Sequence, residues 1–174
     1  MDHAGEKADD GRDAGDGGRT AADDGRDAGN RGRTAGETVH VHACGHENVV
    51  ATHGSTFEVT SDDWLTPAGD CILAVDAETV PAEFDDAFVD ACRSPTATIT
   101  ATLGAGSHEA EIVGRGHPDL TFDSDRSMVG RTSTYVDDRT VLVEADRAAA
   151  DLDRGFVAAL SEGAALDCVL RVAP

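Results

Sequence analysis

Residues 44–75, CGHENVVATHGSTFEVTSDDWLTPAGDCILAV, decide the fold of this chain. The stretch contains a Gly-His pair, a second histidine at His53, a Thr-Glu strand and a turn at Gly69-Asp70. Pro67 presets φ and Gly69 accepts a positive φ, so TPAGD is typical of a turn, here one that leads into a buried strand. Several donors and acceptors thus stand in a span too apolar for a solvated loop, which indicates both a sheet and a site.

The segment before this stretch alternates with period two, which predicts a strand from Val39. One face carries apolar residues and the other carries potential ligands: Val39, Val41 and Ala43 against His40, His42, Cys44 and His46. Downstream, residues 49–53, 56–60 and the CILAV segment read as strands, and Pro81 begins a predicted helix over residues 81–92. TATITATL and HEAEIVG then flank GAGS, which predicts a hairpin.

The second half of the chain repeats this order. Gly45-His46 and Gly116-His117 each precede extended segments, an apolar strand, a helix and a final strand, the second helix being expected over residues 147–160. Chance similarity is the alternative to a duplication. We predict an α+β fold in which two β-β-α-β pseudo-repeats interleave as a barrel-like sheet with two helices, because closure removes sheet edges. A pseudo-two-fold axis would then bring the two Gly-His turns together.

Residues 1–38 form a different kind of segment. Residues 9–22 and 23–36 are near-copies, and neither contains Val, Ile, Leu or an aromatic residue. Such a segment cannot bury enough apolar surface to offset its backbone entropy, so we predict a disordered acidic tail rich in Gly, Asp and Arg. Residues 39–174 are then expected to form a single globular domain.

Charge and cysteine usage bound the classes of function. The net charge of −20 is typical of a salt-adapted, halophilic surface, and it argues against nucleic-acid binding, which needs a basic patch. The four cysteines contain no C-x-x-C pair, which favours reduced intracellular thiols. No apolar run of membrane-spanning length and no secretory signal occur, so the expected location is cytoplasmic with no membrane partner.

Several motifs in combination resemble a known family. GHENVVATH, TFEVT, LTPAGDCI, GHPDLT and DRTVLVEAD, in this order, are similar to the archaeal family known as domain of unknown function 371. The resemblance covers about residues 40–165 and implies an archaeal single-domain protein without supplying an activity, a cofactor or a catalytic residue. The Gly69-Asp70 turn also resembles, over a dozen residues, the Gly-Asp turn of cradle-loop barrels.

The candidate catalytic residues are polar groups around the two Gly-His turns. His46, His53 and His117 are predicted acid-base groups, because imidazole titrates near neutrality. Asp70 is a predicted orienting carboxylate, with capping of its own turn as the structural alternative. Cys71 is expected to be packed and unreactive, since a neighbouring negative charge raises the pKa of a thiol.

A second set is predicted to contact ligand: Gly45, Glu58, Gly116, Arg131 and Ser133. Glycine allows close approach, and an arginine can hold a carboxylate or phosphate. For Glu58 the structural alternative is a cross-strand pair with an arginine such as Arg131. The histidines and Cys44 on the first strand would suit zinc, but they lie about 6.6–7 Å apart at successive positions and no recognised ligand spacing is present. We therefore predict no metal site, with zinc as the alternative and Cys44 as a small core residue.

The function predicted from these residues is binding of a small polar ligand between the two Gly-His turns, with hydrolase or lyase acid-base chemistry as an extension. The alternative is a non-catalytic module that binds RNA or a protein partner through the same concave face. A surface that displays Arg115, Arg126, Arg131 and Arg139 together would favour this alternative.

Overall fold

The structure is a computed structural model that describes residues 38–174. The predicted tail falls almost wholly outside this range. The described part of the chain contains two four-stranded sheets, here called sheet A and sheet B, and two α-helices, in agreement with the predicted α+β class.

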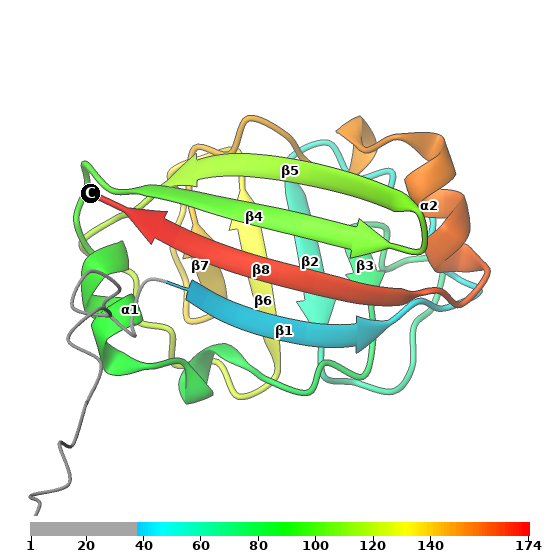
Figure 1. Ribbon diagram of the computed structural model, residues 1–174, viewed down its shortest axis with the longest axis horizontal. Helices are drawn as coiled ribbons and strands as arrows, with labels where there is room; N and C mark the ends of the chain where they lie inside the picture. The colour runs from blue at the N-terminus through cyan, green and yellow to red at the C-terminus, as the bar shows by residue number, and fades with distance from the viewer. Residues whose placement is uncertain (1–37) are drawn as a thin grey trace, which may run out of the picture. The chain divides into compact units, whose positions relative to one another are not determined.

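Sheet A is antiparallel with the order β1-β8-β4-β5 (Figure 1). Its strands are β1 (Thr38–Cys44), β8 (Ala165–Ala173), β4 (Thr98–Ala105) and β5 (His108–Arg115). Alternation decides which face is buried: in β4, residues 99, 101, 103 and 105 are buried, whereas the intervening residues are half-exposed. The predicted hairpin is confirmed between β4 and β5, where Gly106 adopts a φ of 60°.

Sheet B has the order β3-β2-β6-β7. Its strands are β3 (Ile72–Ala74), β2 (Thr56–Thr60), β6 (Ser127–Arg131) and β7 (Thr140–Leu142). The central strands β2 and β6 pair antiparallel with Glu58 opposite Val129 at the middle of the ladder, and each outer strand pairs parallel to its neighbour. Phe57 and Val59 are buried, so Glu58 points to the opposite, outer face of sheet B.

Each predicted helix is a short 3-10 helix followed by an α-helix. Pro81–Glu83 (η2) precedes α1 (Asp86–Cys92), and Ala149–Asp151 (η3) precedes α2 (Arg154–Ser161). The break occurs because the intervening residues are extended, and an aspartate then caps each α-helix: Asp85 accepts from the Ala87 N–H and Asp153 from the Gly155 N–H. Helix propensity alone does not show this break.

Hydrogen bonds confirm the internal repeat. The Glu78 N–H donates to the His42 carbonyl, and the Asp146 N–H donates to the Val113 carbonyl at the equivalent place in the second half. Non-glycine residues with positive φ also occur in equivalent pairs, Ala51 with Phe122 and Asp76 with Glu144. Because such conformations are uncommon outside glycine, their recurrence at matching positions argues for duplication rather than chance. Each half is β-β-β-α-β, one strand more than predicted.

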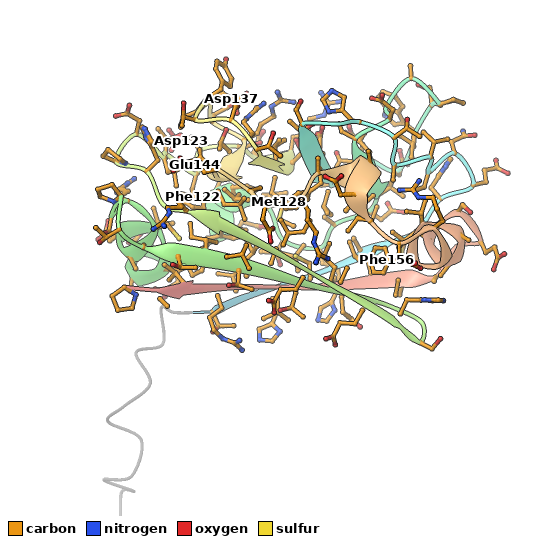
Figure 2. The ribbon with its side chains drawn as sticks, turned by 90° about the horizontal axis from the view of Figure 1, so that it is seen from above. Phe122, Asp123, Met128, Asp137, Glu144 and Phe156 are labelled. Atoms are coloured by element: carbon orange, nitrogen blue, oxygen red, sulfur yellow. The ribbon has the colours of Figure 1, made fainter. Side chains whose placement is uncertain are left out.

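The two sheets pack face to face but are not closed into the predicted barrel. Single bridges join their edges at Cys44 with Val75 and at Arg115 with Val143, and no continuous ladder crosses from one sheet to the other within residues 38–174. Met128 lies between the sheets, whereas Asp137 lies on the side of sheet B that faces away from sheet A (Figure 2). The bulged, short strands of sheet B end before they can pair with sheet A.

Candidate functional site

The two Gly-His turns lie at opposite ends of sheet A. Strands β1 and β5 run antiparallel in this sheet, and each turn follows the carboxyl end of its strand. Seven or eight residues at about 3.4 Å each separate the two ends by roughly 25 Å. Figure 1 shows the same arrangement, with the arrowheads of β1 and β5 pointing in opposite directions. His46 and His117 therefore do not share the predicted cleft.

Both glycines of these turns pack against the end of a helix from the other half of the chain. A Cβ atom on Gly45 would lie 2.1 Å from the Leu160 carbonyl oxygen at the end of α2, and one on Gly116 would lie 2.2 Å from the Cys92 carbonyl oxygen at the end of α1. Real Cβ contacts of this kind do not occur, so only glycine fits. The close approach that these glycines permit is to the backbone at the end of a helix, which accounts for both glycines without a ligand.

The three candidate histidines close turns through the same ring atom. The Asn48 N–H donates to His46 Nδ1 at 3.1 Å, and the Asp119 N–H donates to His117 Nδ1 at 3.1 Å. His53 Nδ1 accepts from the Thr56 N–H at 3.2 Å. A neutral ring that accepts at Nδ1 carries its proton on Nε2 and has no free lone pair for a general base. This geometry fits turn closure rather than acid-base chemistry.

The repeat provides an internal control for His53. Ser124 occupies the equivalent position, and its hydroxyl oxygen accepts from the N–H groups of Arg126 and Ser127, just as His53 Nδ1 accepts from those of Ser55 and Thr56. A serine and a histidine thus perform the same capping role in the two halves.

Asp70 and Cys71, like the histidines, make contacts that hold a loop and its neighbouring strand in place. The Asp70 backbone carbonyl accepts from the Thr52 and His53 N–H groups, at 2.9 and 3.2 Å, so the main chain of this residue anchors the loop. Burial, followed by the charge of Glu58, raises the pKa of the Cys71 thiol to about 11, which agrees with the unreactive thiol expected from the sequence. The neighbouring charge is mainly that of Glu58, with Asp70 a smaller contributor.

The strongest concentration of paired charges lies on the outer face of sheet B. Arg131 Nη2 donates to Asp137 Oδ2 at 2.8 Å, and Arg139 Nη2 donates to the same oxygen at 3.1 Å. Arg139 Nη1 also lies 4.0 Å from Glu58 Oε1. The structure therefore brings together two predicted ligand contacts, Glu58 and Arg131, by way of Asp137 and Arg139, which the sequence analysis did not place in the site.

Contacts with arginine lower the pKa values of two carboxyl groups on this face, those of Asp62 and Asp137. The hydrogen bond from Arg126, 2.7 Å at Nη2, holds the pKa of Asp62 below its ordinary value. Burial acts to raise the pKa of Asp137, but the hydrogen bonds from Arg139 and Thr140 and the charge of Arg131 outweigh it, so this pKa is also lowered. Both carboxylates are consequently ionised and committed to arginine.

Two aromatic residues flank the same face. Trp64 and Tyr135 are the large hydrophobic residues that are exposed within residues 38–174, at 56% and 62%, and they stand in the equivalent β2–β3 and β6–β7 loops. The Arg131 guanidinium lies 4.9 Å from the centre of the Tyr135 ring. Exposure of the lone tryptophan in the fold-deciding stretch could not be foreseen, because its neighbours are a mixture of polar and apolar residues.

A hollow of about 170 Å³ lies beside Trp64 on this face. Its lining combines an aromatic ring, an apolar side chain, two carboxylates and two guanidinium groups: Trp64, Ile72, Glu58, Asp62, Arg126 and Arg139, with the Ser127 hydroxyl beside them. This mixture, an apolar wall with a few convergent polar groups, is typical of a site that binds a small polar ligand.

Ser133 and Arg115 lie outside this hollow. Ser133 is exposed, and its hydroxyl oxygen accepts from the Tyr135 N–H at 3.3 Å within its own loop. Arg115 is at the end of β5 and bridges to Val143 through its backbone. A surface that displays four arginines together was expected to favour binding of RNA or a protein partner. Three of these arginines, Arg126, Arg131 and Arg139, lie on or beside the outer face of sheet B, and Arg115 does not.

Two larger hollows are more open, and the larger of them is lined by His117 together with Tyr135 and Asp137. One, of about 560 Å³, lies beside His117 and contains four aspartates, and the other, of about 470 Å³, lies beside α1. Neither combines an exposed tryptophan with paired charges, and neither contains His46 or His53.

No metal centre can be built from residues 38–174, since no group of three His, Cys, Asp or Glu side chains converges there. On the first strand, His40 and His42 are exposed on sheet A, and His42 pairs with Asp167 on β8. Cys44 is exposed, contrary to the expectation of a core residue, because alternation places it on the outer face with the histidines. Across the same residues, no helix is long and apolar enough to cross a membrane.

A family and a protein of another organism are similar to this chain. The model of a family described as Domain of unknown function (DUF371) matches residues 41–173. The protein named "Uncharacterized protein MJ0206" from Methanocaldococcus jannaschii is 37% identical over 123 residues, which cover 71% of this chain and 90% of that protein. The family match, over residues 41–173, spans both halves of the repeat and the outer face of sheet B.

Proposed function

The chain belongs to the archaeal family described as Domain of unknown function (DUF371), and we propose that it binds a small polar ligand in the hollow beside Trp64 on the outer face of sheet B. The proposal keeps the predicted class of ligand and moves the site from the Gly-His turns to the centre of sheet B. The observation that carries it is the convergence of Trp64, Glu58 and Arg139 on one hollow.

The side chains at this place support binding rather than catalysis. The thiol of Cys71, which donates to Glu58, has a pKa raised to about 11 and is protonated at neutral pH. None of the three candidate acid-base histidines lines the hollow, and each accepts a backbone N–H within its own turn. A rigid sheet that presents fixed donors and acceptors fits recognition of a ligand without chemical change.

The negative charge of the protein favours a small ligand over a polyanion. The sequence carries a net charge of −20, and the arginines of this face are already paired with carboxylates. A polyanion such as RNA would meet repulsion over its whole length, with few free cations to offset it. A small neutral or singly charged ligand touches the hollow alone and avoids this penalty.

Trp64 makes the proposal directly testable, because it is the one tryptophan in the chain. A panel of nucleosides, amino acids, sugar acids and aromatic carboxylates would be added to the full-length protein, with excitation at the red edge of tryptophan absorption. A ligand in the hollow is expected to shift or quench the Trp64 emission and to raise the melting midpoint. Absence of any response across the panel would refute ligand binding at this place.

Variants separate binding in the hollow from a general effect. Glu58→Gln removes a charge that lines the hollow, and Glu111→Gln removes an exposed charge from β5 on the outer face of sheet A. Binding should weaken at least tenfold in Glu58→Gln and remain unchanged in Glu111→Gln. Equal affinity in both variants would place the ligand elsewhere.

One observation favours a second function, docking of a protein partner on the same face. Trp, Tyr and Arg are the residues that dominate protein interfaces, and Trp64, Tyr135 and three arginines all lie on or beside this face. Tyr135→Ala distinguishes the two functions. It should leave a small ligand bound beside Trp64 and should weaken a partner that covers both aromatic residues.

A further inference from the structure

Glu58 has an acceptor position that the protein leaves open. Its side chain is only 14% exposed, and Oε2 accepts a weak hydrogen bond from the Cys71 thiol at 3.4 Å. The nearest cation to Oε1 is Arg139 Nη1 at 4.0 Å, which is beyond hydrogen-bonding distance, and no other side-chain donor within residues 38–174 reaches it. No unpartnered side-chain oxygen is buried within residues 38–174, so Oε1 is open to the hollow, and a ligand with N–H donors can reach a carboxylate whose side chain is mostly buried.

The hollow around Glu58 has the dimensions of one ring system. Its volume of about 170 Å³ corresponds to about six water molecules at roughly 30 Å³ each. Trp64 supplies an aromatic wall and Ile72 an apolar one, so a flat ligand would be accommodated better than a branched aliphatic ligand. Bulkier groups of such a ligand would extend outward, past Arg126, which is 60% exposed in its side chain.

The internal repeat has an apolar residue at the position equivalent to Glu58. The equivalent position in the second half is Val129, which faces Glu58 across the central pair of β2 and β6. Some positions that build the fold keep the same residue in both halves, as in Gly45 with Gly116 and Phe88 with Phe156, whereas others replace one residue by another that does the same work, as in His53 with Ser124. Valine also suits a strand better than a half-buried carboxylate does, so the asymmetry at this pair indicates specialisation of one half.

Resting on the proposed function above, we propose that the ligand is a planar heterocycle that presents two adjacent N–H donors to Glu58, as the edge of guanine does with its ring N–H and amino group. A carboxylate accepts both donors side by side, as it does from a guanidinium group. The heterocycle lies against Trp64, where base-aromatic stacking adds affinity. Adenine presents a ring acceptor at the corresponding position and is repelled by the carboxylate.

The test is titration of the full-length protein with guanosine, inosine, 1-methylguanosine and adenosine, read by Trp64 emission. Inosine lacks the amino group and 1-methylguanosine lacks the ring N–H, so each loses one of the two bonds. Guanosine is expected to bind at least tenfold more tightly than inosine or 1-methylguanosine, and adenosine weakest of all. Glu58→Gln should weaken guanosine binding at least tenfold, with Glu111→Gln unchanged and the melting midpoint of each unliganded variant as the check on folding.

Outcomes separate this inference from the proposed function. If an amino acid or sugar acid perturbs Trp64 and guanosine does not, the hollow is a ligand site and the guanine-type edge is refuted. Equal affinity for guanosine and adenosine, or guanosine binding unaffected by Glu58→Gln, also overturns the inference. If nothing in the wider panel perturbs Trp64, both proposals fail together.

Discussion

Replacement of Gly45 by alanine should destabilise the fold strongly, although the residue is small and lies in a turn. The new Cβ would lie 2.1 Å from the Leu160 carbonyl oxygen and 2.7 Å from the Ala164 carbonyl oxygen, both of them backbone atoms that cannot rotate away. The hydrogen bond from the Gly45 N–H to the Ala164 carbonyl, 2.8 Å, would have to lengthen as the turn moves. Both effects act on one contact between the two halves.

The expected magnitude follows from these two contributions. Overpacking in a dense region destabilises by about 1–3 kcal/mol, and the strained hydrogen bond adds about 1 kcal/mol. A total of about 3 kcal/mol corresponds to a fall of roughly 10 °C in the melting midpoint of a domain of this size. Gly116→Ala should behave alike, since its Cβ would lie 2.2 Å from the Cys92 carbonyl oxygen.

Gly54→Ala is the matched control. A Cβ on Gly54 meets no atom within 4 Å, and its φ is not in the left-handed region. Thermal unfolding followed by circular dichroism should therefore give a midpoint equal to that of the wild type or slightly above it. A Gly45→Ala variant that melts within a degree of Gly54→Ala would contradict the close contact between Gly45 and the end of α2. Gly45 would then again be a candidate for contact with a ligand.

Three further predictions concern single side chains. His53→Ser should retain the wild-type stability, because Ser124 closes the same turn in the other half, whereas His53→Ala should lose about 1 kcal/mol in chemical denaturation. At pH 8 a thiol reagent should modify the exposed Cys44 quickly and Cys71 slowly, since the pKa of Cys71 is raised to about 11; mass spectrometry of digested protein would show the reverse order if this assignment is wrong. The pKa of Asp137 is lowered in the folded state, so its stabilising contribution is present above the ordinary value of 3.8 and is lost as the pH falls through the lower folded value. The stability difference between wild type and Asp137→Asn should thus shrink below about pH 4, and a difference that is constant with pH would contradict the pairing.

The sequence was sufficient for the features that depend on neighbouring residues. Alternation from Val39 placed the first strand and its buried face, and Gly106 marked the hairpin turn. The order of elements in the two halves revealed the repeat. These signals are local, since side-chain period and turn chemistry act over a few residues.

Features set by distant pairing could not be predicted in this way. The sequence does not show that β1 and β5 end at opposite ends of one sheet, and this relation alone separates His46 from His117. The hollow beside Trp64 depends in the same way on Glu58 lying opposite Val129 and on Arg139 reaching it from another loop. Glu58 and Arg131, which were predicted to contact ligand, both lie on the outer face of sheet B, and their contact with a ligand stays a prediction.

The pairing of β1 with β8 has a consequence for the order in which the chain can fold. Strand β1 lies at the start of the described chain, and its hydrogen-bonding partner, β8, lies at the end. The central pair of sheet B likewise joins β2 with β6, from different halves. An emerging N-terminal half therefore has unpaired strand edges and an unfilled contact at Gly45 until α2 and β8 have been synthesised. Because these contacts join distant parts of the chain, folding should be slow relative to that of a protein with local contacts. Pairing of the nine residues of β8 is then the step that completes the fold.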